Sequence, residues 1–390
     1  YAFLSQHLGD LENLETLEHY ETSIAVYERM FRLEPEAVAY DLHPEYLATK
    51  YAVTLPQKDK VAVQHHHAHV AACLVEHRRA DRVIGVALDG LGFGADGTLW
   101  GGEVLVADLL GYERVAHLEP LPLPGGALAI ERPARTAAGW AFALFGQPGL
   151  ERAARLLRFR AAAREPGRRA AVAQGRSSGD DGSYLDDEEL SAVTRQVQTG
   201  ENAPLTSSCG RLFDAVAALA GVRGVITYEG QAAIELEMMS RATGEPYPFA
   251  IEGSLPCGTT APMPGASPGD DLAAGAAAVV RLAPLLGAIM DVAEAGREPG
   301  EIGSRFHVTV AALTLALCRR VREATGIGVA VLAGGVFQNR LVTDLCEAAL
   351  EADRFEVLTG GLVPTNDGGV ALGQAAVAGY TLLHRRGVLD

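Results

Sequence analysis

Three consecutive β patterns within residues 82–121 restrict the possible folds more than any other feature of this sequence. The segments are "RVIGVALDG" (82–90), "LWGGEVLVADL" (99–109) and "GYERVAHLEPL" (111–121), and short turns join them. This spacing predicts an antiparallel meander of three strands. In the later part of the chain, strand patterns alternate with helical patterns. A β-rich early part followed by strand–helix alternation predicts an α/β fold with two lobes.

Apolar periodicity predicts the other elements. A short strand is expected at the start of the chain, with further strands at 37–42, 60–64, 355–361 and the start of 328–350. Helices are expected at 5–33, 44–52, 65–75, 130–176, 209–221, 228–242, 304–325, the end of 328–350 and 363–380. We expect an N-terminal lobe of residues 1–125 and a C-terminal lobe of residues 126–390. The acidic stretch 175–190 is expected to be an exposed, flexible loop.

Composition narrows the class of protein. The formal net charge of −16 argues against a general nucleic-acid-binding surface, which needs a basic stripe. No apolar run reaches the roughly 20 residues that span a bilayer, and no signal peptide opens the chain, so neither a membrane nor nucleic acid is expected as a partner. The five cysteines form no C-x-x-C pair, which predicts reduced, mostly buried thiols in a cytoplasmic protein. Because the chain begins without methionine, we expect it to be a fragment of a longer polypeptide.

Four histidines stand within five positions at the start of a predicted helix, in "VQHHHAHVAACLVEH" (63–77). His65 and His69 are one helical turn apart and share a face. A lone histidine usually has a structural role, but a cluster favours a metal site, since neutral imidazole is the commonest metal ligand in proteins. Two histidines do not complete a site, so other side chains must contribute.

Aspartates flanked by glycine are the natural complement to this pair of histidines. Asp89 ends the apolar strand "VIGVALD", and Asp367 lies in "TNDGG" before the last helix. Taken singly, each is safely explained as a helix cap or turn former. Two histidines with two aspartates would suit iron or zinc, with room for a substrate oxygen. The glycine-rich turn at 89–97 would suit either a phosphate or a tight hairpin.

Six ordered motifs carry a resemblance to a known family. They are HHHAH, "LDGLGFGADGTLWGGE", "SSCGRLFDAVAALAG", "YEGQAAIELE", "LAGGVFQNRLV" and "NDGGVALGQA". With them the chain closely resembles the hydrogenase maturation carbamoyltransferases, HypF, over the C-terminal domain of that longer protein. It is also similar to the tRNA threonylcarbamoyl-transfer (TsaD) enzymes and to antibiotic O-carbamoyltransferases. The resemblance implies a two-lobed actin-like ATPase fold, with nucleotide and metal in the cleft between the lobes.

The resemblance also assigns roles to individual residues. It implies a metal site of His65, His69, Asp89 and Asp367 that holds iron or zinc. It places His66 and His67 beside the metal or facing the substrate, as catalytic candidates. It implies a nucleotide site for ATP or carbamoyl-adenylate at Gly92, Gly94, Gly210, Asp214, Gly334, Gly335 and Asn339. The segment "PGGALAIERPARTAAGW" (124–140) departs from the family pattern, and 158–190 resembles a variable insertion, so neither is assigned a substrate contact.

The implied reaction is carbamoyl transfer. In the family, carbamoyl phosphate and ATP give carbamoyl-adenylate, and this domain passes the carbamoyl group to the C-terminal cysteine of HypE, on the route to the cyanide ligand of [NiFe] hydrogenase. The adenylate-forming domain of the same full-length polypeptide would then be a second partner. Two alternatives remain open: a carbamoyltransferase acting on a small-molecule hydroxyl, and a non-catalytic actin-like nucleotide-binding module.

Overall fold

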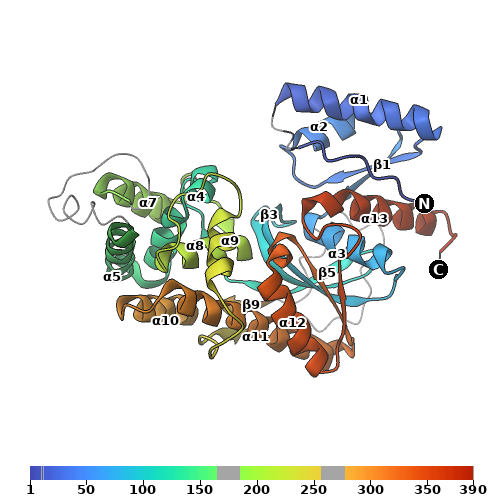
Figure 1. The fold of residues 1–390 in the computed structure, drawn as a ribbon. Helices are drawn as coiled ribbons and strands as arrows, with labels where there is room; N and C mark the ends of the chain where they lie inside the picture. Colours follow the sequence, from blue (N-terminus) through green and yellow to red (C-terminus); the bar gives the residue numbers. More distant parts are fainter. Residues whose placement is uncertain (10, 12, 165–184, 256–276, 390) are drawn as a thin grey trace.

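A mixed β-sheet runs through the centre of the molecule in a computed structural model that describes residues 1–9, 11, 13–164, 185–255 and 277–389 (Figure 1). In spatial order its strands are β11 (Glu356–Thr359), β10 (Val329–Ala333), β3 (Val83–Phe93), β4 (Leu99–Ala107), β5 (Tyr112–Leu118), β9 (Ala278–Arg281) and β8 (Ala250–Glu252). Strands β3, β4 and β5 form the predicted antiparallel meander, which is confirmed. Strands β10 and β11 run parallel to β3, and β9 runs parallel to β5.

The first part of the chain forms a small unit of its own that lies on the last helix (Figure 1). Its elements are α1 (Leu14–Phe31), β1 (Ala37–Asp41), α2 (Leu47–Thr54) and β2 (Asp59–Val63). The two strands pair in parallel as a separate sheet. Both helices begin later than the sequence predicts. Asn13 caps α1 by accepting a hydrogen bond from the Thr16 amide, and the expected strand before it is not formed in the described residues.

Helix α3 (His65–Glu76), which carries the histidines, covers one face of the sheet, and α13 (Val370–Arg385) packs between α3 and the N-terminal unit. Glycines allow the close packing. A Cβ on Gly373 of α13 would overlap the carbonyl oxygen of Ala68, and a Cβ on Gly85 of β3 would overlap Val70. Buried Val70, Leu74 and their neighbours fill the space between α3 and the sheet. The last helix is therefore locked onto the histidine helix, although some 300 residues separate them in the sequence.

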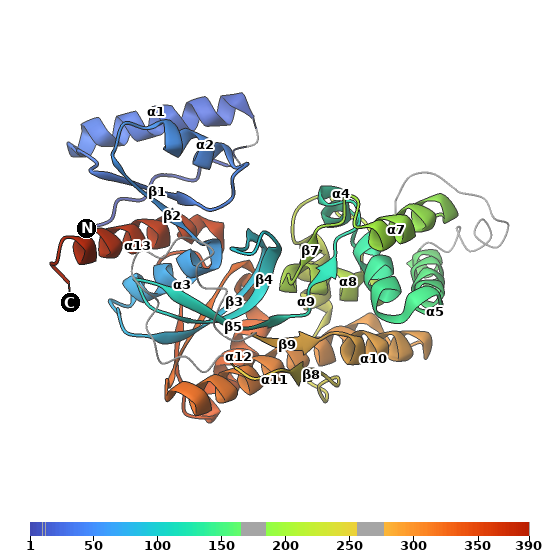
Figure 2. The ribbon, with the colours of Figure 1, turned by 180° about the vertical axis from the view of Figure 1, so that it is seen from behind.

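A larger helical half adjoins the other end of the sheet (Figure 2). Apart from it, the 3-10 turn η2 (Gly335–Gln338) contacts β3, and α12 (Arg340–Ala352) packs against β11 and α11. The elements of the helical half are β6 (Leu121–Pro122), α4 (Ala127–Glu131), α5 (Pro133–Arg164), α7 (Asp187–Thr199), β7 (Leu205–Thr206), α8 (Cys209–Leu219), α9 (Gln231–Met239), α10 (Ala283–Glu294) and α11 (Pro299–Thr325). Trp140, Phe213 and Phe306 are among the side chains of its core. Two separate cores in an α/β chain with a mixed sheet fit an actin-like two-lobed fold.

The expected loop at 175–190 is wrong for its last residues. Residues 187–190 form the first turn of α7, because Asp186 caps that helix by accepting from the Glu189 amide and acidic side chains favour a helix N-terminus. Residues 175–184 lie outside the described residues. The boundary near residue 125 stays a prediction, and strands from both sides of it join the same sheet. In the described part of the chain, no helix combines the length and apolarity needed to cross a bilayer.

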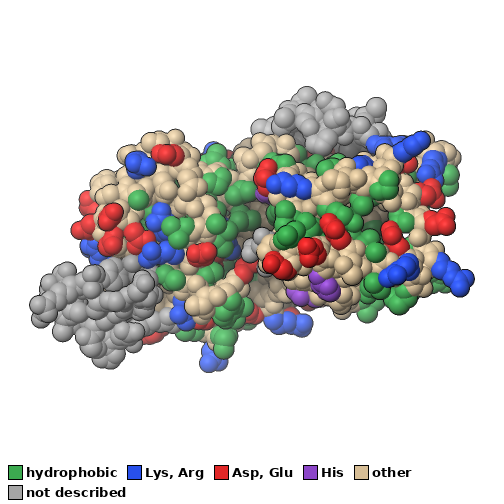
Figure 3. Space-filling view, turned by 90° about the horizontal axis from the view of Figure 1, so that it is seen from above, with side chains coloured by type: hydrophobic (Ala, Val, Ile, Leu, Met, Phe, Trp, Pro, Cys, Tyr) green, Lys and Arg blue, Asp and Glu red, His purple; other side chains and the backbone are tan. Residues whose placement is uncertain are grey.

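Acidic, basic and hydrophobic side chains are interspersed on the face of the molecule seen from above (Figure 3). Large apolar side chains are exposed at several points of the N-terminal unit, among them Phe3, Leu14 and Met30.

Candidate metal and nucleotide site

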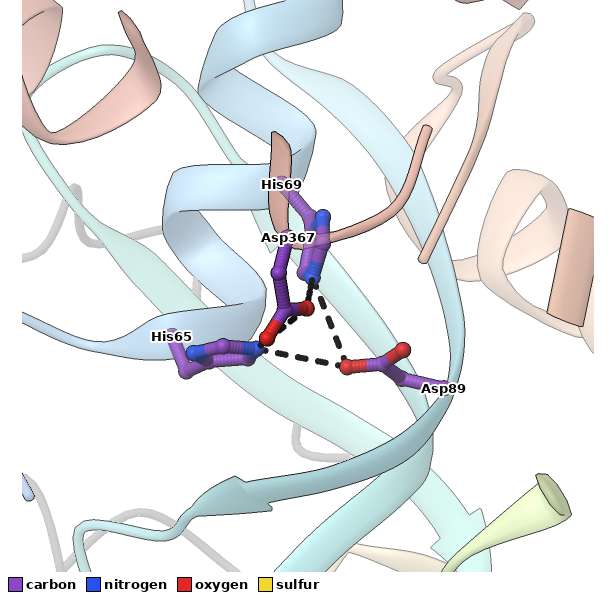
Figure 4. Close-up of side chains that lie close together, drawn as sticks. All are labelled: His65, His69, Asp89 and Asp367. Carbon is purple, nitrogen blue, oxygen red and sulfur yellow. Dashed lines mark ion pairs between the residues drawn. The ribbon is translucent and has the colours of Figure 1, made fainter. Parts of the chain in front are cut away.

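Four side chains from three distant parts of the sequence converge on one point (Figure 4). The ligand atoms of His65, His69, Asp89 and Asp367 all lie within 4.8 Å of one another. Asp89 Oδ2 lies 3.3 Å from His65 Nε2 and 3.4 Å from His69 Nε2. Asp367 Oδ1 lies 3.5 Å from each of the same two nitrogens. Two nitrogens and two oxygens facing one centre form a donor set suited to zinc or iron.

The local sequence explains how each ligand reaches this point. Gln64 caps α3 by accepting from the His67 amide at 2.9 Å, so the helix begins at His65 and both ligand histidines lie in its first turns. Asp89 lies on β3. Asp367 opens η3 (Asp367–Gly369), where Asn366 caps the turn that leads into α13.

Contacts behind the ligands fix their orientation. Asp41, at the end of β1, accepts a hydrogen bond from His65 Nδ1 at 2.9 Å, which leaves Nε2 to face the centre. The Gly335 amide donates to Asp89 Oδ1 at 2.8 Å, which leaves Oδ2 for the centre. The N-terminal unit thus supplies an orienting carboxylate, a role that we did not predict for Asp41. The one signal in the sequence is its place at the end of a strand, before His43-Pro44.

Three of the ligand atoms are buried and lack a hydrogen-bond partner among the described residues: His65 Nε2, His69 Nε2 and Asp89 Oδ2. Buried polar atoms are rarely left unpaired in this way, because each costs free energy comparable to a lost hydrogen bond. The Asp367 side chain is 71% exposed, so it lies at the open side of the group. A divalent cation at this centre would satisfy all three buried atoms, and the residues present therefore fit the implied metal.

The charges at this centre stabilise one another. Burial opposes ionisation of Asp89, but the adjacent His69 and His65 hold its pKa well below the usual value. Burial likewise opposes protonation of His65, yet Asp367, Asp41 and Asp89 raise its pKa well above the usual range. The carboxylates thus favour a positive charge between the two imidazoles. A bound cation would take the place of the protons on the His65 and His69 imidazoles.

The structure places the two intervening histidines differently. Gln64 Nε2 donates to His66 Nδ1 at 3.1 Å, which leaves the His66 Nε2–H directed toward buried Glu103, 4.0 Å away. His67 Nε2 donates to the carbonyl of Asp108 at 2.7 Å. Burial keeps the pKa of both imidazoles below the usual value, so both are neutral. His66 therefore lies next to the ligands, whereas the structure does not bring His67 to the site.

A cavity of 1670 Å³ opens beside the metal ligands. Six residues predicted for the site contribute to its lining: Asp89, Asp367, Gly210, Asp214, Gly335 and Asn339. The lining also includes Glu229, just before α9, and Glu237, within α9, which we did not single out from the sequence. Two of the four candidate metal ligands and four of the predicted nucleotide residues therefore line one cavity.

Three predicted glycines, Gly92, Gly94 and Gly334, are not part of that lining. A Cβ on Gly92 would lie 2.6 Å from His66 Cε1, and a Cβ on Gly94 would overlap the Trp100 ring. Gly334 has φ of +99°, and a Cβ there would overlap the Leu88 carbonyl oxygen. These positions need glycine for close packing around Asp89 and the histidines. Their contact with phosphate stays a prediction.

Asp214 and Asn339 are both held in place by neighbouring side chains. Asp214 Oδ2 lies 3.0 Å from Arg211 Nη2, and burial raises the pKa of this carboxyl group. Asn339 caps α12 by accepting from the Val342 amide at 3.0 Å. Its Nδ2 donates to Nε2 of buried His307 at 2.9 Å, a partner that sequence reasoning missed.

The N-terminus of α8 is fixed against the strand that carries Asp89. Ser208 Oγ donates to the carbonyl of Gly90, and a Cβ on Gly210 would lie 2.9 Å from Gly90 Cα. The buried carboxylate of Glu103 accepts from Ser207 and from Arg114. Since Ser207 and Ser208 precede α8, these contacts join the two halves of the molecule at the cavity.

Comparison with known proteins places the chain among carbamoyltransferases. Residues 85–374 match the family described as carbamoyltransferase, Kae1-like domain, second subdomain, and residues 1–76 match the HypF Kae1-like domain. The chain is 37% identical to carbamoyltransferase HypF2 of Cupriavidus necator, over 97% of this chain and 44% of that protein. It is 32% identical to a carbamoyltransferase HypF homolog of the same organism, over 95% of this chain and 84% of that protein.

The fold agrees with this similarity. A crystal structure of full-length HypF in the phosphate- and nucleotide-bound form matches with a TM-score of 0.79 and 35% identity, over 99% of this chain and 53% of that chain. The T. kodakarensis HypF structure matches with a TM-score of 0.76 and 29% identity, over 99% of this chain and 45% of that chain. The chain thus spans less than half the length of the first curated relatives, at 44% of each.

Proposed function

Because the chain belongs to the HypF carbamoyltransferase family, within which it matches the Kae1-like domain, we propose that it transfers a carbamoyl group from carbamoyl-adenylate to the C-terminal cysteine of HypE. The adenylate would come from carbamoyl phosphate and ATP in another domain of the full-length protein. The observation that carries the proposal is the shared cavity: Asp89 and Asp367, two members of the group of four candidate metal ligands, line it together with four of the predicted nucleotide residues. The nucleotide in the similar HypF structure supports a nucleotide substrate.

The donor set suits a Lewis acid. When bound, iron or zinc would polarise an oxygen of the carbamoyl or phosphate group and offset the charge of the departing AMP. His65 and His69 would hold the cation from the buried side, and Asp41 fixes the His65 ring. Asp367 lies on the exposed side, toward which substrate would approach.

The other residues of the cavity would hold the adenylate. Gly210 lies at the N-terminus of α8, where amides and the helix dipole favour an anion. Asp214, one turn further along, faces the same cavity and offers carboxylate oxygens to the hydroxyl groups of a ribose. A phosphate beside Gly210 would place the carbamoyl group near the metal ligands.

The acceptor thiolate would come from the partner rather than from this chain. The four described cysteines, Cys73, Cys209, Cys318 and Cys346, are all buried. Burial raises the pKa of the Cys73 and Cys346 thiols to about 12 and raises that of the other two as well. Each stays a thiol at neutral pH, and a thiol is a poor nucleophile.

A mass-spectrometric assay tests the proposal. The chain is incubated with carbamoyl phosphate, ATP and HypE, with and without the separately purified adenylate-forming domain. We expect a carbamoylated C-terminal cysteine on HypE only when that domain is added, and in low yield, because the effective concentration of a tethered domain is lost. The Asp89→Asn variant is expected to give none, while the surface variant Asp344→Asn, whose aspartate pairs with Arg340 on α12, should match the parent.

Two results would contradict the proposal. Carbamoylated HypE from the chain alone would place the adenylate-forming step here. Carbamoylation of an added small-molecule alcohol in preference to HypE would favour the O-carbamoyltransferase alternative.

A further inference from the structure

Glu76, the last residue of the histidine helix, binds three consecutive backbone amides of a distant loop. Its Oε1 accepts from the amides of Gly361 at 2.8 Å and Leu362 at 2.7 Å, and its Oε2 accepts from Val363 at 3.1 Å. Burial opposes ionisation of this carboxyl group, but the three donors lower its pKa, so it is a carboxylate at neutral pH. Charge-assisted hydrogen bonds of this kind are stronger than neutral ones.

The position of Glu76 is unfavourable for α3 itself. The C-terminus of a helix carries partial negative charge, which repels a carboxylate and favours lysine or arginine. No capping role explains the residue, because the backbone of His77 closes the helix by donating to the Cys73 carbonyl. The three amides of the loop are therefore what stabilises a carboxylate at this end of the helix.

The loop that Glu76 holds leads directly to a metal ligand. Only Pro364, Thr365 and Asn366 separate its last clamped residue from Asp367. The loop is largely exposed, with Leu362 at 89%, so burial of apolar side chains does little to fix it. A further anchor is the hydrogen bond from the Gly334 amide to the Thr365 carbonyl, at 3.0 Å.

The geometry points to Glu76 as a positioning residue for the metal centre: by holding residues 361–363 it sets where Asp367 stands opposite His65 and His69. Helix α3 then carries two ligands, His65 and His69, in its first turns. Glu76, eleven residues or about 16 Å beyond His65 on the same helix, anchors the loop that bears the exposed ligand Asp367. This inference rests on the metal site of the proposed function and adds a determinant of its affinity that lies outside the ligands and their direct contacts.

Metal affinity, measured by competition against a chromophoric chelator with Zn²⁺ on the 390-residue chain, tests this role. We expect Glu76→Ala to weaken binding about 10- to 100-fold, as loss of a supporting contact behind a ligand commonly does. Glu76→Gln keeps one side-chain oxygen that can accept from two of the amides. Its metal affinity should therefore lie between those of Glu76→Ala and the parent. Glu356→Gln removes a carboxylate that pairs with Arg79 at 2.6 Å, and this variant should bind metal like the parent.

The double variant separates positioning from general loosening of the fold. If Glu76 acts through Asp367, adding Glu76→Ala to Asp367→Ala should not weaken metal binding further. The d–d spectrum of the Co²⁺ form should then be the same in the Asp367→Ala variant and in the double variant. The inference would be overturned, with the proposed metal site intact, if Glu76→Ala weakened metal binding as much in the Asp367→Ala variant as in the parent. An affinity of Glu76→Ala within twofold of the parent would have the same consequence. A parent chain that binds no metal would overturn the proposed site together with this inference.

Discussion

His307 shows how a buried neutral histidine can fix a residue of the cavity. Its Nδ1 donates to the Gly303 carbonyl at 2.7 Å, and its Nε2 accepts from Asn339 Nδ2. Burial lowers its pKa to about 4, so the imidazole is neutral and keeps the lone pair that Asn339 needs. The neutral ring contributes stability that is fully present above the unfolded pKa near 6.5 and is lost as the pH falls toward 4.

We predict that His307→Phe lowers the free energy of unfolding by about 1 kcal/mol at pH 7.5, because the half-buried Asn339 Nδ2 loses its acceptor. Between pH 7.5 and pH 5 the parent should lose about 2 kcal/mol through this histidine, and the variant should lack that part of the loss. Urea unfolding at the two pH values measures both effects. An equal loss in parent and variant would contradict the assignment of the pH dependence to His307.

Single residues also show what the sequence could and could not predict. His65 and His69 could be paired from the sequence because helical spacing alone places them on one face. Asp89 and Asp367 could be joined to them only through the family resemblance, since the fold brings their distant segments together. His67 was predicted beside the site, yet successive helical residues are rotated by about 100°, and its ring bonds the Asp108 carbonyl instead. Asp41 was missed because its contact depends on where a separate small sheet lies against α3.

At the scale of elements, the contact between α3 and α13 brings the two ends of the site together. Gly373 allows it, because a side chain there would overlap the Ala68 carbonyl oxygen, which lies between the ligand histidines in the sequence. The sequence predicted both helices from their periodicity but not this contact, since close approach of two helices depends on the third dimension. The glycine-rich segment "NDGGVALGQA", which contains Gly373, is consistent with this close contact.

Gly373→Ala is expected to force α13 away from α3, to destabilise the chain by about 1–3 kcal/mol and to weaken metal binding, because Asp367 precedes α13 directly. Gly379→Ala is a matched control in the same helix, where an added Cβ meets no atom within 4 Å. That change should be neutral or stabilise by up to about 1 kcal/mol. Chemical denaturation of both variants gives the comparison, and a loss of stability at position 379 as large as that at 373 would contradict this account.

At the scale of the whole molecule, the sequence predicted the α/β class, the meander and the order of most elements, and the structure confirms these. The assembly could not be derived from element order alone. Strands β10 and β11, from late in the chain, pair beside β3, and α13 supports the N-terminal unit. These long-range contacts place Asp41, Asp89 and Asp367 around one histidine helix, so the site depends on early and late parts of the sequence together.

The central claim is that one divalent metal ion is held between His65, His69, Asp89 and Asp367. Anomalous diffraction from crystals of the chain, recorded above and below the iron and zinc absorption edges, tests it most directly. We predict a single peak about 2.0–2.2 Å from the two Nε2 atoms and from an oxygen of each aspartate. The edge at which the peak appears would identify the metal. No peak at this centre in protein loaded with either metal, or a peak held by other side chains, would contradict the account.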